Sequence, residues 1–193
     1  MKYLNIIAEG SSEESFVNDV LVKHFDTLNI FVSTRKIRTG WDKLSNKPAK
    51  GGLLKYSKFK YSPQIQQIHN PYVRINELEM AISKSINNAN FIPYVQLHEF
   101  ESLLLVAPER LLVMYPEKQS AVEKLKRDIE NITPEEINES QQTAPSKRII
   151  KYLPDYEDQK AQVGALVAGD IGITEIRNKC PHFNEWITRL EKL

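Results

Sequence analysis

Acidic side chains mark two places where this sequence could bind a divalent metal. Glu9 directly follows a strand-like apolar segment, and Glu99 and Glu101 follow a second one at residues 91–97. Ligands of open α/β sheets bind at the carboxyl ends of the strands, and side chains two apart on an extended chain share a face. Carboxylate oxygens hold Mg²⁺ or Mn²⁺ while a water attacks phosphorus, so the pattern predicts metal-dependent phosphodiester cleavage. The predicted metal ligands are Glu9, Glu13, Glu99 and Glu101.

Each candidate also has a structural interpretation. Glu13 and Glu14 fall in the first turn of an expected helix, where the dipole favours carboxylates, and Glu14 fits a capping box with Ser11. His98 is either a ligand, a general base or an ordinary hydrogen-bonded histidine. Glu9 is different, because a charge directly after an apolar strand needs a partner or a role. The predicted catalytic residues are Glu9, His98 and Glu99.

A basic segment at residues 35–60 is expected to contact nucleic acid. It contains nine basic residues against one acid, Asp42, together with three aromatic residues and three glycines. Cations and stacking rings suit a phosphate backbone, with DNA favoured over RNA, whereas the alternative is a solvated lysine-rich loop. The predicted contacts here are Arg35, Lys36, Arg38, Lys43 and Lys55.

The candidate residues must be positioned by the elements around them, the first three of which are expected to form a parallel βαβ unit. The expected elements are a strand at 2–8, a helix at 11–26, a strand at 30–34, a loop over 36–73, a helix at 74–87, a strand at 91–97 and a helix from 101 to 106. The last third is expected to be entirely helical. The turn after the first strand lacks the glycine patterns of nucleotide-binding folds.

Composition favours a single intracellular domain. We expect an α/β core at residues 1–106, with a basic loop at 35–73, and a helical part at 107–193 packed on the same core. The longest apolar run is residues 103–107, and the N-terminus is unlike a signal peptide, so a cytoplasmic protein without membrane contact is expected. A single cysteine, Cys180, excludes an internal disulfide and a cysteine-built zinc site.

Four stretches resemble a known family. The segment Ala8-Glu9-Gly10-Ser11-Ser12-Glu13-Glu14 resembles the V-E-G-x-T-E-E opening of Toprim-like proteins, and residues 91–104, 143–149 and 176–183 extend the likeness. The whole chain is similar to the domain-of-unknown-function family 4276, whose members are relatives of the Toprim nucleases. The resemblance implies a Toprim-like Rossmannoid parallel sheet with a helical C-terminal part.

The resemblance also implies a function. It is that of a Mg²⁺- or Mn²⁺-dependent nuclease or nicking subunit acting with a partner ATPase in a phage-defence or restriction-type system. Glu9 matches the first acidic motif, and Glu99 and Glu101 match the later one. The block Ser146, Lys147 and Arg148 matches a basic motif and is expected to clamp a phosphate or carboxylate, or else to start a helix.

One departure from the family pattern affects the predicted site. Relatives carry a strand ending in an Asp-Tyr-Tyr-like motif before the helix at 74–87, whereas no aspartate occurs here between Asp42 and Asp128. Either the chain lacks that strand or the printed sequence omits a segment near residue 60. A missing interior strand would expose its neighbours' edges, which favours omission as a hypothesis; an intact mass close to 22.3 kDa would contradict it.

Two further interpretations remain beside the nuclease. The first is a non-catalytic Toprim-like adaptor that binds nucleic acid or an ATPase without cleaving. The second uses the C-terminal helices as an oligomerisation surface in a homo-oligomer, although their apolar stripes equally suit an internal core.

Overall fold

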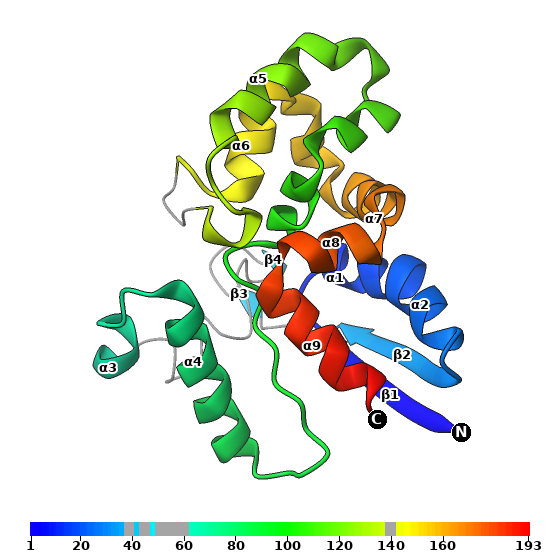
Figure 1. Cartoon of the computed structure of the whole chain (residues 1–193), viewed down its shortest axis with the longest axis vertical. Helices are drawn as coiled ribbons and strands as arrows, with labels where there is room; N and C mark the ends of the chain where they lie inside the picture. The colour runs from blue at the N-terminus through cyan, green and yellow to red at the C-terminus, as the bar shows by residue number, and fades with distance from the viewer. Residues whose placement is uncertain (37–40, 43–46, 49–61, 138–141) are drawn as a thin grey trace.

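The computed structural model describes residues 1–36, 41–42, 47–48, 62–137 and 142–193 of the 193-residue chain. The fold is mixed α/β and mostly helical, with a small parallel sheet (Figure 1). The sheet and helix α2 lie at the right of the view, α3 and α4 at the lower left, and α5 and α6 at the top.

The sheet pairs β1 (Lys2–Ala8) with β2 (Ile30–Lys36) in parallel, in a register from Lys2 opposite Ile30 to Ala8 opposite Lys36. Both predicted strands are confirmed, and the second runs two residues further than expected. Side chains alternate along β1, so that Leu4 and Ile6 pack on the core while the residues between them face outward.

A continuous helical segment connects the two strands. It comprises α1 (Ser11–Phe16), the π-helical turn η1 (Val17–Leu21) and α2 (Val22–Asp26). Its predicted apolar stripe is buried against the core. The predicted capping box is wrong: Gly10 is the N-cap residue and no side chain caps the helix, because Ser11 already lies in the first turn.

Between the sheet and the helical part lie short elements and one long helix. Two-residue strands β3 (Trp41–Asp42) and β4 (Lys47–Pro48) pair antiparallel, and α3 (Pro63–Gln66) precedes α4 (Pro71–Ile86). The predicted helix at 74–87 is confirmed. It begins earlier than predicted because the Asn70 side chain accepts the N–H groups of residues 72 and 73.

The strand predicted at residues 91–97 is wrong, because this segment has no ladder partner within the described chain. Its backbone hydrogen-bonds to a side chain instead: Val95 N–H donates to Glu79 of α4 at 2.7 Å. The helix predicted at 101–106 is replaced by two 3₁₀ turns, η3 (Phe100–Ser102) and η4 (Leu104–Val106). An apolar run alone does not distinguish a paired strand from an extended segment packed on helices.

The last part of the described chain is helical, as predicted. Its elements are η5 (Pro108–Val113), η6 (Pro116–Lys118), α5 (Gln119–Ile129), η7 (Pro134–Glu136), α6 (Pro145–Tyr152), η8 (Pro154–Asp158), α7 (Lys160–Ile171), α8 (Ile173–Lys179) and α9 (Pro181–Glu191). Within the described residues, no helix has both the length and the apolar character that a bilayer span requires.

One main core joins the sheet, the α1–α2 segment and the C-terminal helices. Phe16 of α1 packs against Phe100 and Phe183, with ring centroids 5.4 and 6.1 Å away. Gly164 of α7 is required by this packing, because a Cβ there would lie 2.9 Å from the Phe100 ring. A second, smaller cluster of Ile75, Leu78 and Leu97 holds α4 to the 91–97 segment.

Candidate functional site

Glu9 lies at the carboxyl end of β1, where the sequence placed it, and its side chain is exposed. The Glu13 carboxylate folds back over the turn, since a Cβ on Gly10 would lie 2.5 Å from Glu13 Oε2. Glu14 binds Lys36 Nζ at 3.0 Å across the ends of α1 and β2. The turn therefore carries three carboxylates, one of which is already neutralised by a lysine.

Glu99 serves as a cap for another helix. It follows His98, whose positive φ of 65° turns the chain sharply into η3. One Glu99 oxygen, Oε2, accepts the backbone N–H of Ser146 at 2.9 Å. Because Ser146 lies in the first turn of α6, Glu99 satisfies one of the donors that a helix start leaves unpaired.

Glu101 lies inside the protein, 6% exposed, and its Oε1 accepts the Tyr156 hydroxyl at 3.2 Å. Burial raises the pKa of the Glu101 carboxyl above its ordinary value, and the nearby Glu99 charge raises it further. The extended conformation on which the predicted shared face of Glu99 and Glu101 depends is not found. The chain enters a 3₁₀ turn at Phe100, so one carboxylate reaches α6 and the other reaches η8.

The basic block at the start of α6 makes contacts within the protein. Ser146 is buried, and Lys147 Nζ lies 3.6 Å from the Glu157 carboxylate. Arg148 donates through Nε to the carbonyl of residue 143 at 3.0 Å and through Nη1 to Asp128 Oδ2 at 3.3 Å. Arg148 thus joins α5, α6 and the segment before α6, as a structural arginine would.

The other predicted nucleic-acid contacts divide between two places. Arg35 and Lys36 close β2, with Lys36 held by Glu14 and by the Ser11 hydroxyl at 3.1 Å. Arg38, Lys43 and Lys55 lie outside the described residues.

The described residues do not assemble the predicted metal centre. Among them, no three histidine, cysteine, aspartate or glutamate side chains converge as a metal site requires. Glu99 and Glu101 hold a helix N-terminus and a buried tyrosine instead. The remaining carboxylates whose side chains are not described are Asp42 and Glu139. No catalytic step through a metal follows from this arrangement.

A buried polar cluster that the sequence did not indicate connects α9 to η7. The Glu135 carboxylate, 0% exposed, accepts the N–H of His182 at 3.0 Å and that of Phe183 at 2.9 Å. These are donors of the first turn of α9, where the helix dipole also favours a carboxylate. Burial nevertheless raises the pKa of Glu135, and the two N–H donors only partly offset this effect.

The same cluster also connects α4 to α9. His182 Nε2 lies 3.0 Å from Glu79 Oε1, and its ring stacks on Tyr94 with centroids 5.2 Å apart. Burial lowers the pKa of His182, but the bond to Glu79 and the charges of Glu79 and Glu135 outweigh it, so the pKa is raised. The proline of residue 181 marks this helix start in the sequence, but it does not identify Glu135 as the partner.

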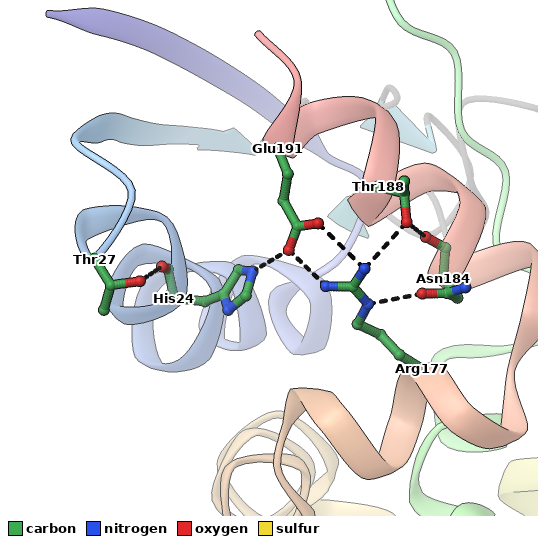
Figure 2. A network of polar contacts seen from close by, with 6 residues as sticks. All are labelled: His24, Thr27, Arg177, Asn184, Thr188 and Glu191. Carbon is green, nitrogen blue, oxygen red and sulfur yellow. Dashed lines mark hydrogen bonds and ion pairs between the residues drawn. The ribbon is translucent and has the colours of Figure 1, made fainter.

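Arg177 organises a second network, which connects α8, α9 and α2 (Figure 2). Its guanidinium binds both oxygens of Glu191 at 2.5 and 3.1 Å and donates to Asn184 and Thr188 at 2.7 and 3.0 Å. His24 of α2 binds the same Glu191 carboxylate at 2.8 Å. Burial raises the pKa of Glu191, but Arg177 and His24 outweigh burial and the pKa is lowered.

Comparison with known proteins places the chain in a family. The family model of a domain of unknown function, DUF4276, matches residues 8–191. Neither the curated proteins nor the solved structures contain a match to the chain. The matched region includes Glu9, the 98–101 block and both polar networks of α9. Because the match omits only the first seven and the last two of the 193 residues, the chain belongs to the DUF4276 family.

Proposed function

We propose that this chain is a Toprim-like adaptor, which binds nucleic acid or a partner ATPase and does not itself cleave phosphodiesters. The observation that carries the proposal is the use of Glu99 and Glu101 in internal contacts. Glu99 caps α6 through Ser146, and Glu101 accepts the Tyr156 hydroxyl from a position 6% exposed.

Metal chemistry explains why these contacts matter. Hard divalent cations require several oxygen ligands at one point, and each carboxylate ligand must be deprotonated. The raised pKa of Glu101 means that this carboxyl holds its proton to a higher pH than an exposed glutamate. Binding a metal through Glu101 would therefore require the loss of that proton and a rearrangement of its contact with Tyr156.

The second candidate is the Mg²⁺- or Mn²⁺-dependent nuclease or nicking subunit of a phage-defence or restriction-type system, acting with a partner ATPase. One observation favours it: the charge of Glu99 raises the pKa of Glu101, so these two carboxylates lie close enough to repel. A divalent cation would relieve that repulsion. Glu9, at the end of β1, keeps the position expected of an anchoring ligand.

One substitution distinguishes the two functions. Supercoiled plasmid is incubated with Mn²⁺ and either the wild type or Glu9→Gln, which keeps the shape of the side chain and removes its charge. The adaptor predicts no nicking above background by either protein. Nicking by the wild type that disappears in Glu9→Gln would overturn the adaptor and establish the nuclease.

Binding is measured on the same two proteins. Fluorescence anisotropy of a labelled DNA duplex across a salt series gives both the affinity and the number of phosphates neutralised. The adaptor predicts salt-sensitive binding that survives Glu9→Gln. The alternative target of the adaptor is tested with a purified candidate ATPase, and a chain that binds neither DNA nor an ATPase would contradict the proposal.

A further inference from the structure

A shallow hollow lies between α5 and α6, which contact each other at the top of the view in Figure 1. Among the described residues it is lined by Lys124, Arg127 and Asp128 of α5 and by Tyr152 of α6, and its volume is about 340 Å³. The three α5 residues share one helix face because they are spaced three and four apart. The hollow is open to solvent, so a ligand reaches it without any movement of the helices.

Positive charge exceeds negative charge around this α5–α6 hollow. Its lining carboxylate, Asp128, already binds two cations of α6, Arg148 Nη1 at 3.3 Å and Lys151 Nζ at 3.6 Å. Lys124 and Arg127 are exposed and form no ion pair with a described residue. Within the described part of the chain, four cations therefore surround a single lining carboxylate.

Neighbouring acidic residues do not remove this excess. Glu123 and Glu130 lie on or directly after α5, but neither lines the hollow. Helix α6 contains no acidic residue at all. Cations held close together repel one another, and a bound anion relieves the repulsion. The α5–α6 hollow is therefore suited to an anionic ligand.

The shape and the aromatic residue of the hollow indicate the class of anion. Its cations lie on two helices around a shallow, open surface, so their charge is spread out and is not focused on one point. A polymer of phosphates neutralises several such cations at once. Tyr152 is half-buried, and Lys151 Nζ lies 4.7 Å from the centroid of its ring. Cations interleaved with an aromatic ring suit nucleic acid better than a free phosphate.

We propose that the α5–α6 hollow binds the phosphate backbone of nucleic acid, with Lys124 and Arg127 contacting phosphates. Asp128 is a positioning residue, because it holds Arg148 and Lys151 beside the hollow. This inference rests on the proposed adaptor function and selects nucleic acid from its two targets. It also adds a binding surface that lies outside the basic segment at residues 35–60.

A double variant, Lys124→Gln with Arg127→Gln, tests the proposal by anisotropy of a labelled DNA duplex across a salt series. Each phosphate contact contributes about 0.9 to the slope of log K against log salt concentration, so the slope should fall by about 1.8. At about 0.1 M salt the affinity should fall by roughly 10- to 100-fold. The substitutions leave the 35–60 segment unchanged, so the difference from the wild type reports on the hollow alone.

Two control proteins separate a local contact from net charge. Lys23→Gln with Lys192→Gln removes the same charge from exposed positions on α2 and directly after α9. These positions lack the hollow, so salt screening should keep the affinity within about twofold of the wild type. Lys124→Arg with Arg127→Lys keeps both charges in the hollow and should bind like the wild type. Equal melting temperatures of all four proteins check that the fold is retained.

The outcomes separate this inference from the adaptor function. If the wild type binds DNA and the hollow variant binds as tightly as the Lys23 and Lys192 control, the inference is overturned and the adaptor stands. A wild type that binds no DNA would overturn the inference together with the DNA-binding form of the adaptor. Loss of binding to a purified ATPase while DNA binding is kept would also overturn it, because the hollow would then bind a protein.

Discussion

The buried carboxylate of Glu135 gives the sharpest test of what holds α9 in place. Glu135→Ala removes both acceptors of the His182 and Phe183 N–H groups, which are themselves buried. Each buried donor left unsatisfied costs about 1–3 kcal/mol. The variant also removes a carboxylate that is destabilised by burial, as its raised pKa shows, and this gain offsets part of the loss. We therefore expect the free energy of unfolding to fall by about 2–4 kcal/mol.

Urea unfolding followed by tryptophan fluorescence measures this loss. Trp186 lies on α9 and stacks on Tyr94 with ring centroids 4.2 Å apart, so its emission reports on the docking of this helix. For a chain of this length, a loss of 2–4 kcal/mol corresponds to a melting temperature lower by roughly 5–15 °C. Glu135→Gln keeps one carbonyl acceptor and is expected to fall between the wild type and the alanine variant.

The neighbouring residue provides a matched control. Glu136 is exposed and bonds only to the Thr133 hydroxyl among the described residues, so Glu136→Ala is expected to change stability by less than about 0.5 kcal/mol. If Glu135→Ala unfolds within about 0.5 kcal/mol of the wild type, the carboxylate does not hold the start of α9 and the reasoning is refuted.

Two further predictions concern the other buried and networked groups. The raised pKa of Glu101 means that its contribution to stability is fully present below about pH 4.5 and is lost as the pH rises through the raised value. Glu101→Gln stays neutral and keeps an acceptor for Tyr156. Its free energy of unfolding should therefore rise relative to that of the wild type between about pH 4 and pH 8, as measured by urea titrations. A difference between the two proteins that does not change with pH would contradict the raised pKa of Glu101. Arg177→Lys loses the two-pronged contact with Glu191 and is expected to cost about 1 kcal/mol, discounted for partial exposure, by thermal unfolding. The exposed Arg189→Lys is its control and should be neutral.

Local patterns predicted the elements that carry their own signal. The alternation of β1, the apolar stripe of Phe16 to Phe25 and the proline-opened helices of the last third are all found in the structure. Such patterns report which face of an element is buried, and that information lies within a few residues.

Contacts between distant segments could not be predicted in this way. Glu135 reaches a backbone 47 residues further on, and Glu79 meets His182 across 103 residues. A glutamate at a helix start resembles a cap for its own helix, whereas Glu135 and Glu99 cap other helices. The 91–97 segment has the composition of a strand, but pairing needs a neighbouring edge, and its Val95 N–H meets a carboxylate instead.

The position of Glu9 directly after β1 is common to both candidate functions, because parallel sheets collect their ligands at the carboxyl ends of their strands. A nuclease needs further carboxylates at that point, whereas Glu99 and Glu101 are bonded to Ser146 and Tyr156. Nicking that depends on Glu9 would therefore require these contacts to rearrange. DNA binding that survives Glu9→Gln would leave them intact.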